Sequence, residues 1–164
     1  MPLFVLVGLF FLQSGRRSDD GHHVHYDTTV ACLEGLPIPA DVIVECSPSQ
    51  PLLRDNTAAF VIGRTFVPSR GERGPILLDA LQVSPIPGDP DDASYDTHIP
   101  SFPIPVVIAQ GSVASASSTD SCATLSFPLA VSDYVQSSVK RSTVLSVHHQ
   151  PALLSHTWLI NLTA

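Results

Sequence analysis

Several features that would point to a particular class of protein are scarce in this sequence of 164 residues. Charged side chains make up only 14% of it, against about 25% in an average chain, which argues against a coiled coil or long solvated helices. Lys and Arg together number 8 and Asp and Glu number 15, so the net charge is −7. Because nucleic-acid binding without sequence preference depends on basic side chains that neutralise phosphates, this balance disfavours it.

Long hydrophobic runs are also missing. No apolar stretch reaches the roughly 20 residues that a membrane-spanning helix needs, so we expect no membrane span. The stretch Leu3–Leu12 is short enough for the core of a signal peptide, but its basic residues, Arg16 and Arg17, follow it instead of preceding it. The sequence therefore favours an intracellular protein over a secreted one, and a buried strand or a short interfacial segment are the other interpretations of the run.

Cysteine offers little chemistry. The three cysteines, Cys32, Cys46 and Cys122, form no C-x-x-C pair, which excludes the usual zinc-ribbon and thiol-redox motifs. We expect them to be small buried side chains or free thiols. A Cys32–Cys46 disulfide is the alternative if the protein is exported.

Proline, in contrast, is abundant and spread along the whole chain. There are 15 prolines, about twice the average share, and they leave few uninterrupted windows for a helix. The segments between them are rich in β-branched and aromatic residues, most clearly Thr57–Val67, and the stretch around Leu125–Val131 alternates between apolar and polar residues. Short strands joined by turns are the natural interpretation, with a long loop over residues 85–105.

Two glycines interrupt strand patterns, Gly63 and Gly111, and mid-strand glycines allow bulges or sharp bends. The sequence therefore predicts an all-β fold, a small OB-like Greek-key barrel. An Ig-like β-sandwich is the alternative, although Trp158 follows all three cysteines, unlike the Cys-Trp-Cys order of immunoglobulin cores. We predict an apolar N-terminal segment and a polar, His-rich linker over residues 1–29, then a single β-barrel domain over residues 30–164.

Four stretches carry a resemblance to known proteins. TAAFVIGRTFVPS (57–69), ILLDALQVSPIPGDP (76–90), VVIAQGSVASASS (106–118) and FPLAVSDYV (127–135) resemble a group of uncharacterised basidiomycete fungal proteins with OB-like barrels. The resemblance covers about residues 40–150. It implies a fold and brings no mechanism, because no catalytic motif is known for that group.

No pattern of a catalytic or metal site stands out. The chain has no G-x-S-x-G, Walker, G-x-G-x-x-G or H-E-x-x-H motif, so we expect no enzyme activity, no catalytic residues and no cofactor. His22, His23 and His25, with Asp27, and a second group of His148, His149 and His156 offer metal-binding side chains. We interpret both groups as ordinary solvated histidines and predict no metal; a His-dependent metalloenzyme stays a minor alternative.

The best-localised functional feature is a group of arginines beside aromatic residues. Arg64 and Phe66 lie on the strongest predicted strand, and Arg70 and Arg73 lie in the turn after it. On an OB barrel such a strand and loop border the groove where bases stack on aromatic rings and phosphates meet arginines. We therefore predict a non-enzymatic binding module whose site contains these four residues and whose ligand is single-stranded nucleic acid or a protein partner. A small secreted β protein is the alternative.

Overall fold

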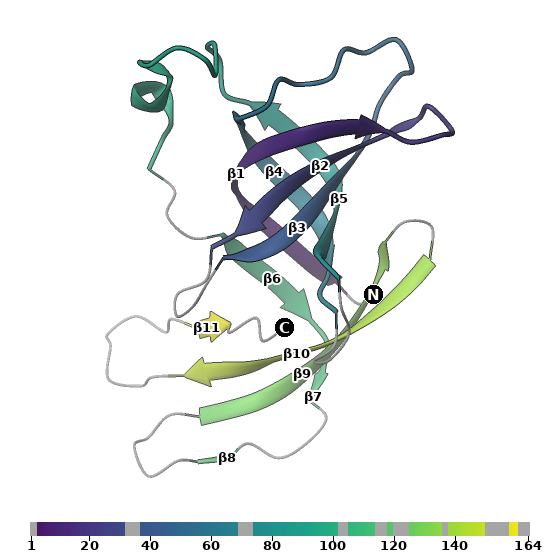
Figure 1. Cartoon of the computed structure of the whole chain (residues 1–164). Helices are drawn as coiled ribbons and strands as arrows, with labels where there is room; N and C mark the ends of the chain where they lie inside the picture. The colour runs from purple at the N-terminus through teal and green to yellow at the C-terminus, as the bar shows by residue number, and fades with distance from the viewer. Residues whose placement is uncertain are drawn as a thin grey trace.

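The computed structural model shows an all-β protein, as the sequence predicts, with one short 3-10 helix, η1 (Tyr95–His98) (Figure 1). It describes residues 3–31, 37–68, 74–101, 105–113, 118–119, 125–135, 138–149 and 158–160, with side chains for residues 3–31, 37–68, 74–101, 105–112, 129–131 and 135. Within these residues, no helix has the length and apolar character needed to cross a bilayer.

The first sheet forms a ring. Its strands are β1 (Leu3–Arg17), β2 (His23–Val30), β3 (Ile38–Glu45), β4 (Thr57–Phe66), β5 (Ile76–Pro85) and β6 (Val106–Gln110). They follow the order β2-β3-β5-β4-β1-β6, and β1 also pairs with β2. Strands β1, β2, β3, β5 and β4 are therefore joined edge to edge in a closed circuit, which we call the five-strand ring. Within it β3 and β5 are parallel and the other neighbours are antiparallel.

Strand β1 closes the ring because it bends. Its first part, from Val5 to Leu12, pairs with β4, and its last part pairs with β2. The register shifts between these two parts, where Ser14 has a φ of 51°. The next residue, Gly15, passes close to the ring of Tyr26: a Cβ there would lie 2.8 Å from the aromatic carbon Cε1. A side chain at residue 15 would therefore push β1 away from β2.

The core lies inside the ring and follows from the alternation of side chains along each strand. The buried, inward-facing residues include Phe4, Leu6, Phe10, Leu12, Val24, Tyr26, Val42, Val61, Ile76 and Leu78. Four of them come from β1 alone, so the apolar start of the chain supplies a large part of the core.

This arrangement differs from the sequence prediction for residues 1–29. The predicted apolar segment and polar linker contain two ring strands, β1 and β2. Strand β2 reads His-Val-His-Tyr-Asp: its polar residues point outward while Val24 and Tyr26 are buried. A strand with one solvent-exposed face is polar at every second position. When only composition is considered, such a strand resembles a polar linker.

The second sheet contains β7 (Ser112–Val113), β8 (Ser118–Thr119), β9 (Leu125–Val135), β10 (Ser138–His149) and β11 (Trp158–Ile160). Its long β9–β10 hairpin lies below the ring in Figure 1. Val131 of β9 is buried in the core cluster of the ring, and Leu129 packs against that cluster. The hairpin therefore covers one end of the ring.

Both mid-strand glycines lie where the strand pattern breaks, as predicted. Gly63 sits at a register shift between β4 and β5. Gly111 separates β6 from β7, so the chain passes there from the first sheet to the second. A Cβ at Gly111 would overlap the carbonyl oxygen of Ala130, which explains why this crossing needs a glycine.

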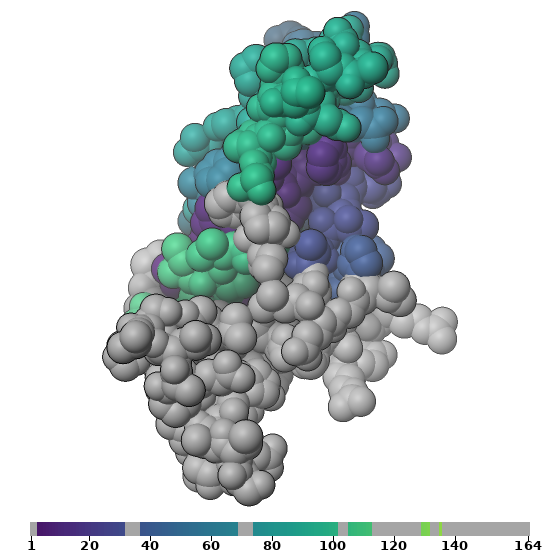
Figure 2. All heavy atoms as spheres, turned by 90° about the vertical axis from the view of Figure 1, so that its left-hand side faces the viewer, coloured from purple at the N-terminus to yellow at the C-terminus, as the bar shows by residue number. Residues whose placement is uncertain are grey.

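The segment after β5, predicted as a long loop, lies over part of the opposite end of the ring. In the space-filling view its atoms lie over the upper end, above β1 (Figure 2). Tyr95 of η1 is buried and anchors the segment: its hydroxyl accepts a hydrogen bond from the Ala58 amide at 3.1 Å and donates one to the Ile86 carbonyl at 3.2 Å.

Truncation of an N-terminal core residue tests whether β1 belongs to the folded core. We expect Leu12→Ala to lower the free energy of unfolding by about 2–5 kcal/mol, because Leu12 is fully buried. The matched control, Leu81→Ala, removes a leucine that is 56% exposed and should cost less than about 0.5 kcal/mol. Urea unfolding followed by circular dichroism measures both. Equal effects would contradict the assignment of β1 to the core.

Candidate functional site

A groove of about 510 Å³ lies on the outer face of strands β2, β3 and β5. It is lined by Ser18, Asp20, His23, His25, Ile43, Glu45, Arg64, Asp79, Ala80 and Leu81. These residues come from the β1–β2 turn and from four ring strands. The groove is therefore formed where the pairing of these strands brings residues from distant parts of the sequence together.

Strand alternation places the polar side chains of the groove. Along β2, Val24 and Tyr26 point into the core, so His23 and His25 point outward. Along β3, Val42 is inward and its neighbour Ile43 is outward, yet Ile43 is only 3% exposed. Ile43 is therefore covered by its polar neighbours and forms an apolar floor under a polar rim.

Asp20 organises the β1–β2 turn at one end of the groove. Its carboxylate accepts hydrogen bonds from the Ser18 hydroxyl and from the His22 amide, and its Oδ2 lies 3.0 Å from Nδ1 of His23. These three contacts, led by the Ser18 hydroxyl, hold the pKa of Asp20 well below its usual range. Asp20 is therefore ionised at neutral pH and fixes His23 in place.

The second histidine is held from the neighbouring strand. Nδ1 of His25 lies 2.9 Å from Oδ2 of Asp41, and both side chains are largely buried, with 27% and 16% exposed. The other oxygen of Asp41, Oδ1, is buried and has no hydrogen-bond partner in the described part of the chain. Buried polar atoms without partners are rare in proteins, because each loses its hydration without compensation.

The groove carries more negative than positive charge. Its lining contributes three carboxylates, Asp20, Glu45 and Asp79, against the single guanidinium of Arg64. Arg64 and Asp79 are cross-strand partners in the β4–β5 register, so opposite charges face each other there. Glu45 is exposed at the end of β3 and extends the negative rim.

Only one of the four site residues predicted from the sequence is shown to line this groove. Arg64 and Phe66 share the outer face of β4, where both are half-buried, and Arg64 lines the groove. Phe66 is not part of its lining. Arg70 and Arg73 lie outside the described residues.

The candidate metal ligands of the first histidine group do not all face the groove. His23 and His25 face the groove, whereas His22 belongs to the β1–β2 turn. Among the described side chains, no group of three or more His, Cys, Asp or Glu residues has a geometry that could hold a metal ion. Cys46 is a free thiol, whereas Cys32 and Cys122 lie outside the described residues.

The sequence did contain a signal for the part of the site that we missed. The alternation from His23 to Asp27 has the period of a half-buried strand, and applying that test there would have found the outward histidines. Glu45 and Asp79 had no such signal, since their proximity depends on the parallel pairing of β3 with β5.

The comparisons with known proteins add nothing to this geometry. No protein-family model matches the chain, and neither the curated proteins nor the solved structures contain a significant match.

Loss of the Asp20 carboxylate should show as a change in acid stability. Because the pKa of Asp20 is lowered on folding, its ionised form stabilises the protein above about pH 4, and this contribution is lost as the pH falls further. We expect Asp20→Asn to lower the melting temperature at pH 7 and to have a smaller effect at about pH 2.5.

The control for this experiment is Asp96→Asn, which removes a carboxylate from η1. Thermal melts between about pH 2.5 and 7 compare the two variants with the wild type. A difference between Asp20→Asn and wild type that is independent of pH would contradict the proposed role of the carboxylate.

Proposed function

We propose that this chain is a non-enzymatic binding module with an OB-like barrel and that its outer groove binds a basic segment of a protein partner. The strand circuit β1-β2-β3-β5-β4, with β3 parallel to β5 and a sharply bent β1, supports the OB-like barrel over an Ig-like sandwich. OB folds bind their ligands on the face of strands 2 and 3, beside the loop that joins strands 1 and 2. The groove lies on that face.

The charge of the groove is the observation from which we choose the ligand. The groove is lined by three carboxylates and one guanidinium over an apolar floor, so a Lys or Arg side chain with an aliphatic stem matches both parts. The buried Asp41 Oδ1, two residues from the floor residue Ile43, is a further acceptor on the same face of β3. A phosphate backbone would instead meet repulsion from this rim.

Single-stranded nucleic acid, the other ligand predicted from the sequence, depends mainly on Arg70 and Arg73. With Arg64 placed opposite Asp79, the described part of the site gives it less support. Binding of single-stranded nucleic acid is therefore the competing outcome of the experiment described next.

The test measures binding of two labelled probes by fluorescence anisotropy at low salt, a hexalysine peptide and a fifteen-residue oligothymidine. We expect saturable binding of hexalysine, weakened about two- to tenfold by Glu45→Lys, because the change reverses a charge at the rim of the groove. Binding should also weaken as salt rises.

A matched variant separates a local site from the overall negative charge. Asp96→Lys makes the same charge change on η1 and should leave hexalysine binding within about twofold of wild type. An equal loss of hexalysine affinity in both variants would mean that the overall negative charge of the protein causes the binding, and it would overturn the proposal. Tighter binding of oligothymidine than of hexalysine would overturn it in favour of a nucleic-acid ligand.

A further inference from the structure

A second concave site lies at the end of the five-strand ring opposite the β9–β10 hairpin. It is a pocket of about 260 Å³, lined by residues of β2, β3, β5 and the segment between β3 and β4, among them Tyr26, Val44, Cys46, Gln50, Leu53 and Val83. The segment between β3 and β4, residues 46–56, arches over the ring interior and leaves this space beneath it. We call it the mouth pocket.

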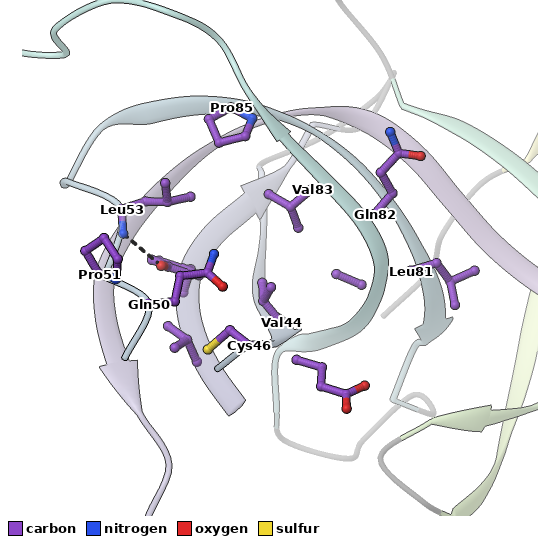
Figure 3. Close-up of a pocket in the computed structure, with 13 residues that line it drawn as sticks. Val44, Cys46, Gln50, Pro51, Leu53, Leu81, Gln82, Val83 and Pro85 are labelled. Carbon is purple, nitrogen blue, oxygen red and sulfur yellow. Dashed lines mark hydrogen bonds between the residues drawn. The ribbon is translucent and has the colours of Figure 1, made fainter. Parts of the chain in front are cut away.

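The arch is fixed at both ends, so the pocket exists before any ligand arrives. The guanidinium of Arg17 donates hydrogen bonds to the carbonyl oxygens of Gly21, Ser47 and Gln50 and contacts the Cys46 sulfur at 3.3 Å. At the other end, the Leu53 amide donates to the Tyr26 hydroxyl at 3.0 Å, the contact drawn in Figure 3.

Further contacts tie the end of the arch to strand β1. The Ser14 amide donates to the Asp55 carboxylate at 2.8 Å, and the Gln13 side chain donates to the Asn56 side chain at 2.8 Å. Binding pockets for small molecules are usually preformed in this way, because a rigid pocket loses little entropy when it is filled.

The pocket stays open because the inward positions at this end of the ring carry small side chains. Val44, Ala80 and Val83 occupy the places that larger residues such as Phe4 and Phe10 occupy deeper in the ring. In Figure 3, Val44, Cys46, Leu53 and Val83 point into the space, while Leu81 and Gln82 extend away from it. An engineered apolar cavity of about 150 Å³ holds benzene, so this pocket has room for one or two rings.

The polar groups at the rim define the chemistry of the ligand. The Gln50 side chain reaches over the pocket, and its amide can both donate and accept hydrogen bonds (Figure 3). The Glu45 carboxylate lies on the lining, and the Arg17 guanidinium lies behind Cys46. Arg17 is not part of the lining, and Glu45 is exposed at the end of β3, so its charge is solvated and the pocket interior offers no charged partner to an anion or a cation.

We infer that the mouth pocket binds an uncharged small molecule, made of one or two apolar rings and a polar group that both donates and accepts hydrogen bonds. The ring system contacts the valines and the Tyr26 side chain, and the polar group meets the Gln50 amide. This site shares Glu45, Ala80 and Leu81 with the outer groove, but it opens to the inside of the ring and does not depend on the function proposed for the groove.

The test uses three probes with the same ring: indole-3-carboxamide, its anionic relative indole-3-carboxylate and the cation tryptamine. Isothermal titration calorimetry at pH 7 should give saturable binding of the carboxamide, with a Kd of about 0.1–1 mM. Both charged relatives should bind at least about fivefold more weakly. Tighter binding of either would overturn the assigned ligand class.

Val83→Phe fills the pocket and should weaken carboxamide binding at least about tenfold. The matched control, Val106→Phe, makes the same change on β6, where Val106 is 51% exposed, and should bind within about twofold of wild type. Unchanged binding in a folded Val83→Phe variant would overturn the proposal.

A second readout does not require Val83→Phe to fold. In a Cys32→Ser/Cys122→Ser variant, Cys46 is the remaining thiol, and its rate of alkylation by iodoacetamide reports access to the pocket. Saturating indole-3-carboxamide should slow this reaction several-fold, while the same concentration of indole-3-carboxylate should slow it less. An unchanged rate, or equal slowing by both compounds, would overturn the site.

Discussion

The double pairing of strand β1 is the constraint on which the rest of the structure depends. One strand satisfies the backbone hydrogen bonds of β4 along its first part and those of β2 along its last part, with a bend at Ser14 between them. Backbone groups buried without partners are costly, so closing the sheet into a ring removes the two edges that an open sheet would expose. The same closure encloses the apolar side chains of β1.

Both concave sites depend on the strand pairing within the ring. The outer groove requires the outward residues of β2 and β3 to lie beside those of β5, which the parallel β3–β5 pairing provides. The mouth pocket requires a ring with an open end and an arch held over it, and Arg17, near the end of β1, holds that arch. The two sites differ in chemistry because alternation sends polar side chains outward and apolar side chains inward.

Much of the fold could be predicted from local patterns. The strand at Thr57–Phe66, the bulge at Gly63 and the bend at Gly111 all follow from residue type and spacing, since β-branched residues favour strands and glycine allows close backbone approach. The structure of the first 29 residues was harder to predict. An apolar run and a polar run, taken separately, look like a targeting segment and a linker, and only their pairing makes them neighbouring strands.

The sequence by itself determined the all-β character, because its prolines break helices and its strand segments alternate with the period of a pleated sheet. It also placed Arg64 on a strand. Only the tertiary structure decided which strands became neighbours, and hence that Arg64 lies opposite Asp79 and that Asp20, Glu45 and His25 line one groove. Side chains far apart in the chain come together through strand pairing, and local patterns of residues do not specify which distant strands become neighbours.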